Sequence, residues 1–224
     1  KNNDNSLNIK KYIPDLHTFK IQNNKIILNN VLINKKIFLK SHLCYNQMKH
    51  FPIDKAIIII RHPLDVFVSL YNYYELDKYK LDELVDYFSL HHTLPLLKNF
   101  NFPSWSEHLK SWINSNVNYY LFKYSDLIND FDNQIVNLGN FFNLKINDEK
   151  IQIKKRNTSF TNLKSIEINE KKKNLDGFFS DNMKNKKTYF MNVGKNGNYL
   201  RFLNDNQITK LKNSFNKELK KYNL

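Results

Sequence analysis

A fully apolar strand followed by an aromatic-rich helical segment dominates the hydrophobic pattern of this chain. Residues 56–60 read Ala-Ile-Ile-Ile-Ile without polar alternation, which predicts a strand covered on both faces, as in parallel sheets flanked by helices. Pro63 predicts the start of a helix that runs to about Asp77, because proline is tolerated in a first helical turn. Arg61 is therefore expected at the carboxyl end of an interior strand.

Other segments continue this alternation of strands and helices. The patterns first predict short strands within 21–41, the last of them at about 36–41, and then a helix at 81–90. A capping box of Ser104 and Glu107 predicts the start of the next helix, which is followed by a strand at 118–124. A helix at 126–144, closing at or just beyond Gly139, and a helix at 204–222 complete the series. This order favours an α/β fold with a parallel sheet and a single domain over residues 1–224.

Two segments of the final third differ from this pattern. Residues 164–187 are polar and rich in lysine with little periodicity, which predicts a mobile surface segment. After them, Gly194 and Gly197 lie within four residues of each other. They allow the backbone to approach a ligand closely, or they form an ordinary tight turn, and both interpretations stay open.

Composition narrows the class of protein. A chain of 224 residues with 41% hydrophobic residues can bury a substantial core, and its net charge of +14 implies an anionic partner, although its lysines are scattered. The single cysteine, Cys44, excludes a disulfide-stapled module and a cysteine-based zinc site. No apolar run has membrane-spanning length and the first residues lack the apolar core of a signal peptide, so we expect a soluble, cytoplasmic protein.

Arg61 is a candidate anion-binding residue. Open α/β sheets bind ligands at the carboxyl ends of their strands, and the planar guanidinium group suits phosphate. The alternative, in which Arg61 only pairs with Asp65 or another nearby carboxylate, is equally supported by the pattern. Lys40 and His42 follow an earlier expected strand at positions i and i+2, so their side chains should point to the same side and share a site.

Other chemistries fit the chain less well. His91 and His92 are adjacent, but no spacing of histidine, cysteine and carboxylate residues matches a zinc site. No serine lies on the glycine-flanked elbow of a hydrolase. Nucleic-acid binding suits the charge and the abundant tyrosines, but the aromatic residues follow core periods, so a non-catalytic basic domain that binds nucleotides or nucleic acid is the alternative function.

Six motifs occur in a fixed order along the chain. They are FLKSHL at 38–43, RHPLDVFVS at 61–69, SWSEHLKSW at 104–112, LFKYSDL at 121–127, NTSF at 157–160 and FMNVGKNGNY at 190–199. Together they resemble the family of sulfotransferases that use 3'-phosphoadenosine 5'-phosphosulfate (PAPS). The resemblance implies a P-loop-NTPase-like parallel sheet flanked by helices.

The resemblance also implies roles for individual residues. His42 corresponds to the general base and Lys40 to an active-site cation, while Arg61 and Ser69 correspond to the residues that hold the 3'-phosphate of PAPS. The residues implied to bind the cofactor are Arg61, Ser69, Tyr124, Thr158, Ser159, Phe160, Phe190, Met191, Gly194 and Lys195. The implied partner is a hydroxyl acceptor on a small molecule, glycan or lipid, and no metal is implied.

The chain departs from the family pattern at two places. Asn192 and Val193 stand where the family has an Arg-Lys pair, which leaves Lys195 as a partial substitute in the phosphate site. The family's P-K-S-G-T-T-W loop has no counterpart in residues 1–37, because the first glycine is Gly139. The chain is therefore expected to be either an N-terminally truncated fragment or a degenerate relative, and the intact pair of Lys40 and His42 favours the fragment. In either case we expect weak nucleotide binding and little or no catalytic activity.

Overall fold

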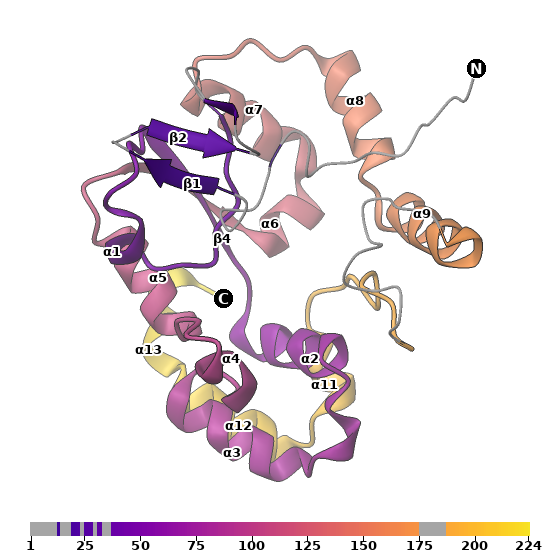
Figure 1. Ribbon diagram of the computed structural model, residues 1–224. Coiled ribbons are helices and arrows are strands. Elements are labelled where there is room, and N and C mark those ends of the chain that lie inside the picture. The colour runs from indigo at the N-terminus through magenta and orange to yellow at the C-terminus, as the bar shows by residue number, and fades with distance from the viewer. Residues whose placement is uncertain (1–12, 14–18, 23–24, 29–30, 33–36, 175–186) are drawn as a thin grey trace.

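The computed structural model describes residues 13, 19–22, 25–28, 31–32, 37–174 and 187–224 (Figure 1). Within them, two strands form a parallel pair and three others form a separate antiparallel sheet. Helices make up most of the remaining chain. The expected α/β class is confirmed.

The parallel pair is built from β4 (Lys55–Ile60) and β5 (Asn118–Lys123). Their register runs from Lys55 opposite Asn118 to Ile60 opposite Lys123, so both strands end at the same edge. Figure 1 shows β4 leading directly toward α2 (Pro63–Tyr73), as the Ile-Arg-His-Pro sequence predicts. This junction places Arg61 beside the start of a helix.

The expectation that β4 is covered on both faces is wrong for the described residues. Ile58 and Ile60 are only 4% and 2% exposed, whereas Ile57 and Ile59 are 37% and 63% exposed. Successive side chains of a strand point to opposite faces, and in β4 it is Ile58 and Ile60 that pack in a buried cluster. An unbroken apolar run thus does not by itself show that both faces are covered.

The antiparallel sheet contains β1 (Phe19–Gln22), β2 (Lys25–Leu28) and β3 (Val31–Leu32), in that order. The expected strand at about 36–41 is wrong, because residues 37–39 have no regular structure and Lys40 forms only an isolated bridge; residue 36 lies outside the described residues. The short helix α1 (Tyr45–Met48) follows.

The helices near the two strands match the predicted pattern with shorter bounds. The helix expected to reach Asp77 ends at Tyr73, because Glu75 has a left-handed backbone (φ 51°) that separates α2 from the 3-10 helix η3 (Leu76–Lys78). The capping box of Ser104 and Glu107 is confirmed at the start of α5. The other helices of this part are α3 (Leu81–His91), α4 (Pro95–Asn99) and α5 (Trp105–Ile113).

The helix expected at 126–144 is two helices, α6 (Tyr124–Asn129) and α7 (Phe131–Phe141). Asp130 separates them because its backbone (φ −140°, ψ 51°) is not helical. The helix ends at Phe141, just beyond Gly139 as expected, and Gly139 lies inside α7, where a Cβ atom would stand 2.7 Å from Cδ1 of Ile146. Its small size therefore serves packing.

The segment 164–187, predicted to be mobile, contains helical structure over residues 164–173, and residues 175–186 lie outside the described part. Residues 164–173 belong to α9 (Phe160–Lys173), which follows α8 (Asp148–Asn157). Glu167 and Glu170 of this helix are buried. The lysine-rich composition concealed a helix because its buried positions are carboxylates and not apolar residues.

The terminal helix expected at 204–222 is divided at Phe215 into α12 (Asp205–Ser214) and α13 (Asn216–Tyr222), preceded by the short α11 (Tyr199–Phe202). Helices α3 and α12 pack side by side, with α2 and α11 next to them (Figure 1). The C-terminal helices therefore complete the core around α2.

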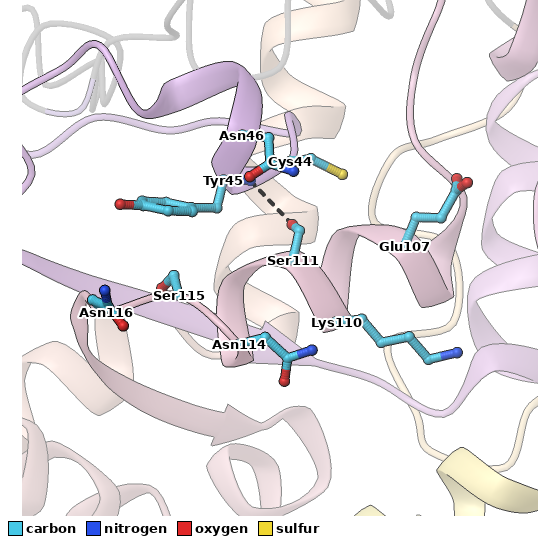
Figure 2. Close-up of a pocket in the computed structure, with 9 residues that line it drawn as sticks. All are labelled: Cys44, Tyr45, Asn46, Glu107, Lys110, Ser111, Asn114, Ser115 and Asn116. Atoms are coloured by element: carbon cyan, nitrogen blue, oxygen red, sulfur yellow. Dashed lines mark hydrogen bonds between the residues drawn. The ribbon is translucent and has the colours of Figure 1, made fainter.

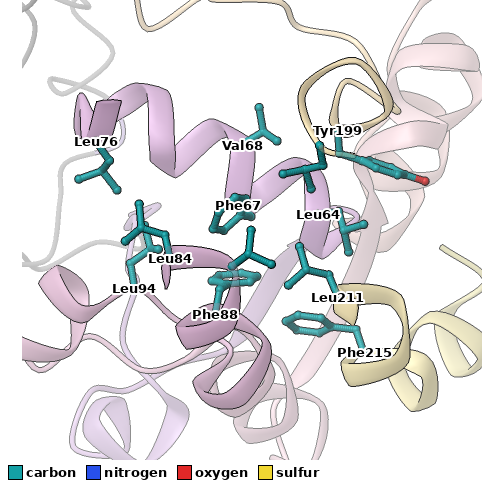
Figure 3. Packing of buried hydrophobic residues seen from close by; sticks show 12 residues of the cluster. Leu64, Phe67, Val68, Leu76, Leu84, Phe88, Leu94, Tyr199, Leu211 and Phe215 are labelled. Atoms are coloured by element: carbon teal, nitrogen blue, oxygen red, sulfur yellow. The ribbon is translucent and has the colours of Figure 1, made fainter. Parts of the chain in front are cut away.

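Two hydrophobic clusters hold these elements. Figure 3 shows the larger one, in which Phe67, Phe88 and Phe215 are completely buried between α2, α3 and the end of α12. The smaller cluster joins Ile58 and Ile60 of β4 to Leu109 and Trp112 of α5. Together the clusters fix the start of α2, and with it Arg61, relative to the C-terminal segment.

Candidate functional site

Arg61 lies where β4 ends and α2 begins. His62 caps this helix, since its Nδ1 accepts a hydrogen bond from the N–H of Leu64, and Pro63 is the first helical residue. Burial lowers the pKa of His62, which favours the neutral ring that can accept this bond. The sequence thus places a cation beside the positive end of a helix, an arrangement that suits an anion.

The guanidinium group of Arg61 stacks over the ring of Tyr124, with its Cζ 4.6 Å from the ring centre. One terminal nitrogen lies 3.4 Å from the carbonyl oxygen of Lys195. The Nε atom is buried and has no hydrogen-bond partner among the described residues. A buried donor without a partner calls for an explanation, and an anionic ligand would provide one.

The alternative in which Arg61 only pairs with a carboxylate is not what the structure contains. Among the described residues, Arg61 forms no salt bridge. The Asp65 carboxylate instead accepts hydrogen bonds from the N–H groups of Gly197 and Tyr199, at 2.9 and 3.2 Å. Sequence reasoning missed this role, because nothing local relates positions 65 and 197.

Gly194 and Gly197 both have positive φ angles, 64° and 73°, and at Gly194 a close approach is also required. A Cβ atom there would stand 2.0 Å from the ring of Phe160. This contact brings the NTSF motif against the loop that carries Lys195. Arg61, Tyr124, Phe160, Gly194 and Lys195 therefore form one contiguous group, which we call the Arg61 group.

Phe190 and Met191 join this group through their backbone. Their N–H groups donate to the two carboxylate oxygens of Glu167, at 2.5 and 2.8 Å. The ring of Phe190 is 55% exposed and lies 6.1 Å from that of Tyr73, centre to centre. Segment 187–199 thus runs between α9 and the helices α2 and α11 (Figure 1).

Ser69 is exposed on α2, between two residues that contact this segment. Asp65, Ser69 and Tyr73 follow one another at spacings of four residues and share a face of the helix. Asp65 bonds Gly197 and Tyr73 contacts Phe190, so the intervening Ser69 faces the residues between them. Its position is compatible with a ligand held at the Arg61 group.

Thr158 and Ser159 have structural partners at the junction of α8 and α9. The Thr158 hydroxyl donates to the carbonyl oxygen of Lys154, at 2.8 Å. The Ser159 hydroxyl caps α9 by accepting from the N–H of Asn162, at 3.3 Å. Both side chains are exposed next to Phe160. Their hydrogen bonds fix the end of α8 and the start of α9, and thereby the position of Phe160.

His42 and Lys40 are both exposed, and the contacts of His42 lie with residues outside the Arg61 group. The imidazole of His42 lies 6.1 Å from the ring of Phe102, centre to centre. It also acts electrostatically on His108 of α5, whose pKa is lowered to about 4, chiefly by burial. Because no strand forms at 37–41, strand alternation does not align the side chains of Lys40 and His42.

We predict that His108 makes the stability of the protein depend on pH. The unfolded state binds a proton with a pKa of 6.5 and the folded state only with a pKa of about 4, so the unfolded state binds more protons below pH 6.5. Stability is therefore complete above pH 6.5 and declines toward pH 4. Lowering the pH to 5 should cost about 2 kcal/mol from this residue.

Urea denaturation at pH 7.5 and pH 5 measures this loss. His108→Gln should reduce the difference between the two values by about 2 kcal/mol, whereas the same change at the exposed His50 should leave it intact. An unchanged pH dependence in His108→Gln would show that this residue is not the source.

A cavity of about 560 Å³ lies between the start of α1 and one face of α5 (Figure 2). The Ser111 hydroxyl, at its centre, accepts a hydrogen bond from the N–H of Tyr45, at 3.0 Å. Its lining consists of Cys44, Tyr45, Asn46, Glu107, Lys110, Ser111, Asn114, Ser115 and Asn116. No residue of the Arg61 group lines this cavity, so the chemistry of that group lies elsewhere.

The histidine, cysteine and carboxylate side chains of the described part of the chain form no group of three or more that could hold a metal ion. None of its helices is long and apolar enough to cross a membrane.

Comparisons with known proteins agree with the motifs. A family model described as "Sulfotransferase domain" matches residues 2–223. No curated protein matches the chain. The family resemblance seen in the sequence is thereby confirmed.

Solved structures of similar fold include three complexes with PAP. Mouse sulfotransferase SULT7A1 with PAP matches with a TM-score of 0.62 and 21% identity, over 84% of this chain and 68% of that one. Retinol dehydratase with androsterone and the inactive cofactor PAP matches with a TM-score of 0.62 and 18% identity, over 85% of this chain and 55% of that one. Retinol dehydratase with retinol and PAP matches with a TM-score of 0.58 and 20% identity, over the same shares.

Proposed function

Because this chain belongs to the sulfotransferase-domain family, we propose that it transfers a sulfuryl group from PAPS to an acceptor hydroxyl. The observation that carries the proposal is the Arg61 group. Its guanidinium has a buried Nε without a protein partner, stacks on Tyr124 and lies beside the start of α2. A nucleotide phosphate would satisfy that donor, and the aromatic rings nearby offer surfaces for a base.

The proposed cofactor site extends along segment 190–195. Arg61 and Ser69 bind the 3'-phosphate of PAPS, with Lys195 as an additional cation. Tyr124 and Phe160 lie beside the purine, and Phe190, Met191 and Gly194 supply the backbone that borders the nucleotide. Thr158 and Ser159 border the same pocket at the start of α9. The contacts between Phe160 and Gly194 and between Arg61 and Lys195 support this grouping.

The proposed reaction is an in-line transfer, analogous to phosphoryl transfer. His42 accepts the proton of the acceptor hydroxyl while the hydroxyl oxygen forms a bond to the sulfur of PAPS. The bond between that sulfur and the bridging phosphate oxygen breaks, and adenosine 3',5'-bisphosphate (PAP) leaves with the electron pair. Lys40 stabilises negative charge on the transferring group, a type of interaction that often provides a large part of catalysis.

The proposed acceptor is a small molecule that carries a hydroxyl group. Two of the similar structures, both of retinol dehydratase, contain androsterone and retinol, which are hydroxylated hydrophobic compounds. In this chain, the ring of Phe102 beside His42 would supply an apolar surface for such a compound. Glycan and lipid hydroxyls belong to the same chemical class and form part of the acceptor panel.

Calorimetry with PAP tests the proposed cofactor. We expect a dissociation constant on the order of 10 to 100 µM, because the Arg-Lys pair of the family is replaced by Asn192 and Val193. Sulfuryl transfer from PAPS to the panel of hydroxyl compounds then tests the reaction. Undetectable PAP binding at millimolar concentration, together with tight binding of RNA, would instead support the nucleic-acid-binding alternative.

A further inference from the structure

We propose that Asp65 and Glu167 are positioning residues that hold the segment 190–199 in the shape required to bind the 3'-phosphate of the nucleotide. This inference rests on the proposed function, because it concerns the same site. It assigns a role to two buried carboxylates that accept hydrogen bonds from the backbone of this segment. Both act through the backbone of the segment that carries Gly194 and Lys195.

Asp65 holds the C-terminal end of the segment. It is 1% exposed, and its two carboxylate oxygens accept from the N–H groups of Gly197 and Tyr199. A buried carboxylate is costly unless it is well hydrogen-bonded, and two N–H donors offset that cost. Asp65 lies one helical turn beyond Arg61. The start of α2 therefore positions both the guanidinium group of Arg61 and, through Asp65, the neighbouring loop that carries Lys195.

Glu167 holds the N-terminal end. It is completely buried, and its two oxygens accept from the N–H groups of Phe190 and Met191. Lys164 and Lys171 lie on the same stripe of α9 and donate to carbonyl oxygens of Met191 and Thr188, each at 2.5 Å. One face of α9 thus bonds the backbone of residues 188–191, and these hydrogen bonds do not involve the side chains of Phe190 and Met191.

Residues 192–196 lie between these two anchors. The N–H groups of residues 193–196 donate to no described residue, whereas that of Asn192 donates to the carbonyl oxygen of Phe190. Since position 192 is asparagine and position 193 is valine, the loop binds an anion through Lys195 and its backbone N–H groups. Backbone donors work only at fixed positions, and Asp65 and Glu167 set those positions.

Neutral, nearly isosteric substitutions test this role. In Asp65→Asn and Glu167→Gln, one carboxylate oxygen becomes an NH2 group, which cannot accept a hydrogen bond from the backbone. We expect the dissociation constant for PAP to rise about tenfold in each variant. Binding of adenosine 5'-monophosphate, which lacks the 3'-phosphate, should change less than twofold, and hydrogen exchange of segment 190–199 should become faster.

The control is Glu83→Gln, which removes the same charge from an exposed position on α3 and should match the wild type. Unchanged PAP affinity in both anchor variants would overturn the inference, as would an equal loss for both nucleotides, which indicates a general structural defect.

Should Asp65→Asn fail to fold, Glu167→Gln tests the other anchor independently. If the wild type binds no PAP, the proposed function fails, while unaltered hydrogen exchange in the variants would by itself refute the anchoring.

Discussion

Replacing Arg61 with alanine is expected to weaken the binding of PAP about 100-fold. Charge-assisted hydrogen bonds contribute roughly 1.5 to 3 kcal/mol each, and the guanidinium group of Arg61 has a buried donor without a protein partner. Arg61→Lys should recover only part of the loss, because an ammonium group lacks the planar fork that stacks on Tyr124. Calorimetry with PAP measures both effects.

Arg201→Ala is the matched control, since Arg201 lies exposed on α11 outside the Arg61 group. It removes the same charge from the same protein, and its affinity should equal that of the wild type. Equal losses of PAP affinity in Arg61→Ala and Arg201→Ala would show that the effect comes from net charge alone. Full affinity in Arg61→Ala would remove Arg61 from the binding site.

Replacing His42 with alanine is expected to lower the rate of sulfuryl transfer by about 10² to 10⁴, the usual contribution of a general base. Affinity for PAP should change less than twofold, because the described contacts of the Arg61 group do not include His42, which lies beside Phe102 and acts electrostatically on His108. The rate is measured with saturating PAPS. A loss of turnover without a loss of PAP affinity is expected if His42 is a general base, whereas a residue that binds the cofactor would change both.

His50→Ala provides the comparison, because His50 is an exposed histidine eight positions further along the chain. Its rate should equal that of the wild type. A normal rate in His42→Ala would refute the assignment of the base. A parallel loss of PAP affinity would place His42 in the cofactor site instead.

Local signals predicted the β4–α2 junction and the start of α5 correctly. At the junction, an apolar strand, a proline at the first helical position and an arginine between them each fix the backbone within a few residues. At α5, Ser104 and Glu107 form the predicted reciprocal cap. These features depend on neighbours in the sequence, so the pattern alone is sufficient to find them.

Other expectations failed where distant residues decide the outcome. The pattern of residues 57–60 gave no indication that Ile57 and Ile59 would be exposed, because coverage of a strand depends on elements far away in the chain. The polar sequence after Phe160 concealed α9, whose buried positions are carboxylates with backbone partners in another segment. Periodicity of apolar residues cannot reveal a face that is buried by hydrogen bonding.

The sequence by itself determined the family, because six ordered motifs carry that information and the family match spans residues 2–223. It also determined which residue types are available for an anion site. The tertiary structure alone decided that Arg61 stacks on Tyr124, that Phe160 packs against Gly194, and that Asp65 and Glu167 hold the loop between them. The reason is physical: these contacts join residues more than 20 positions apart, and only the packing of whole helices and strands brings them within reach.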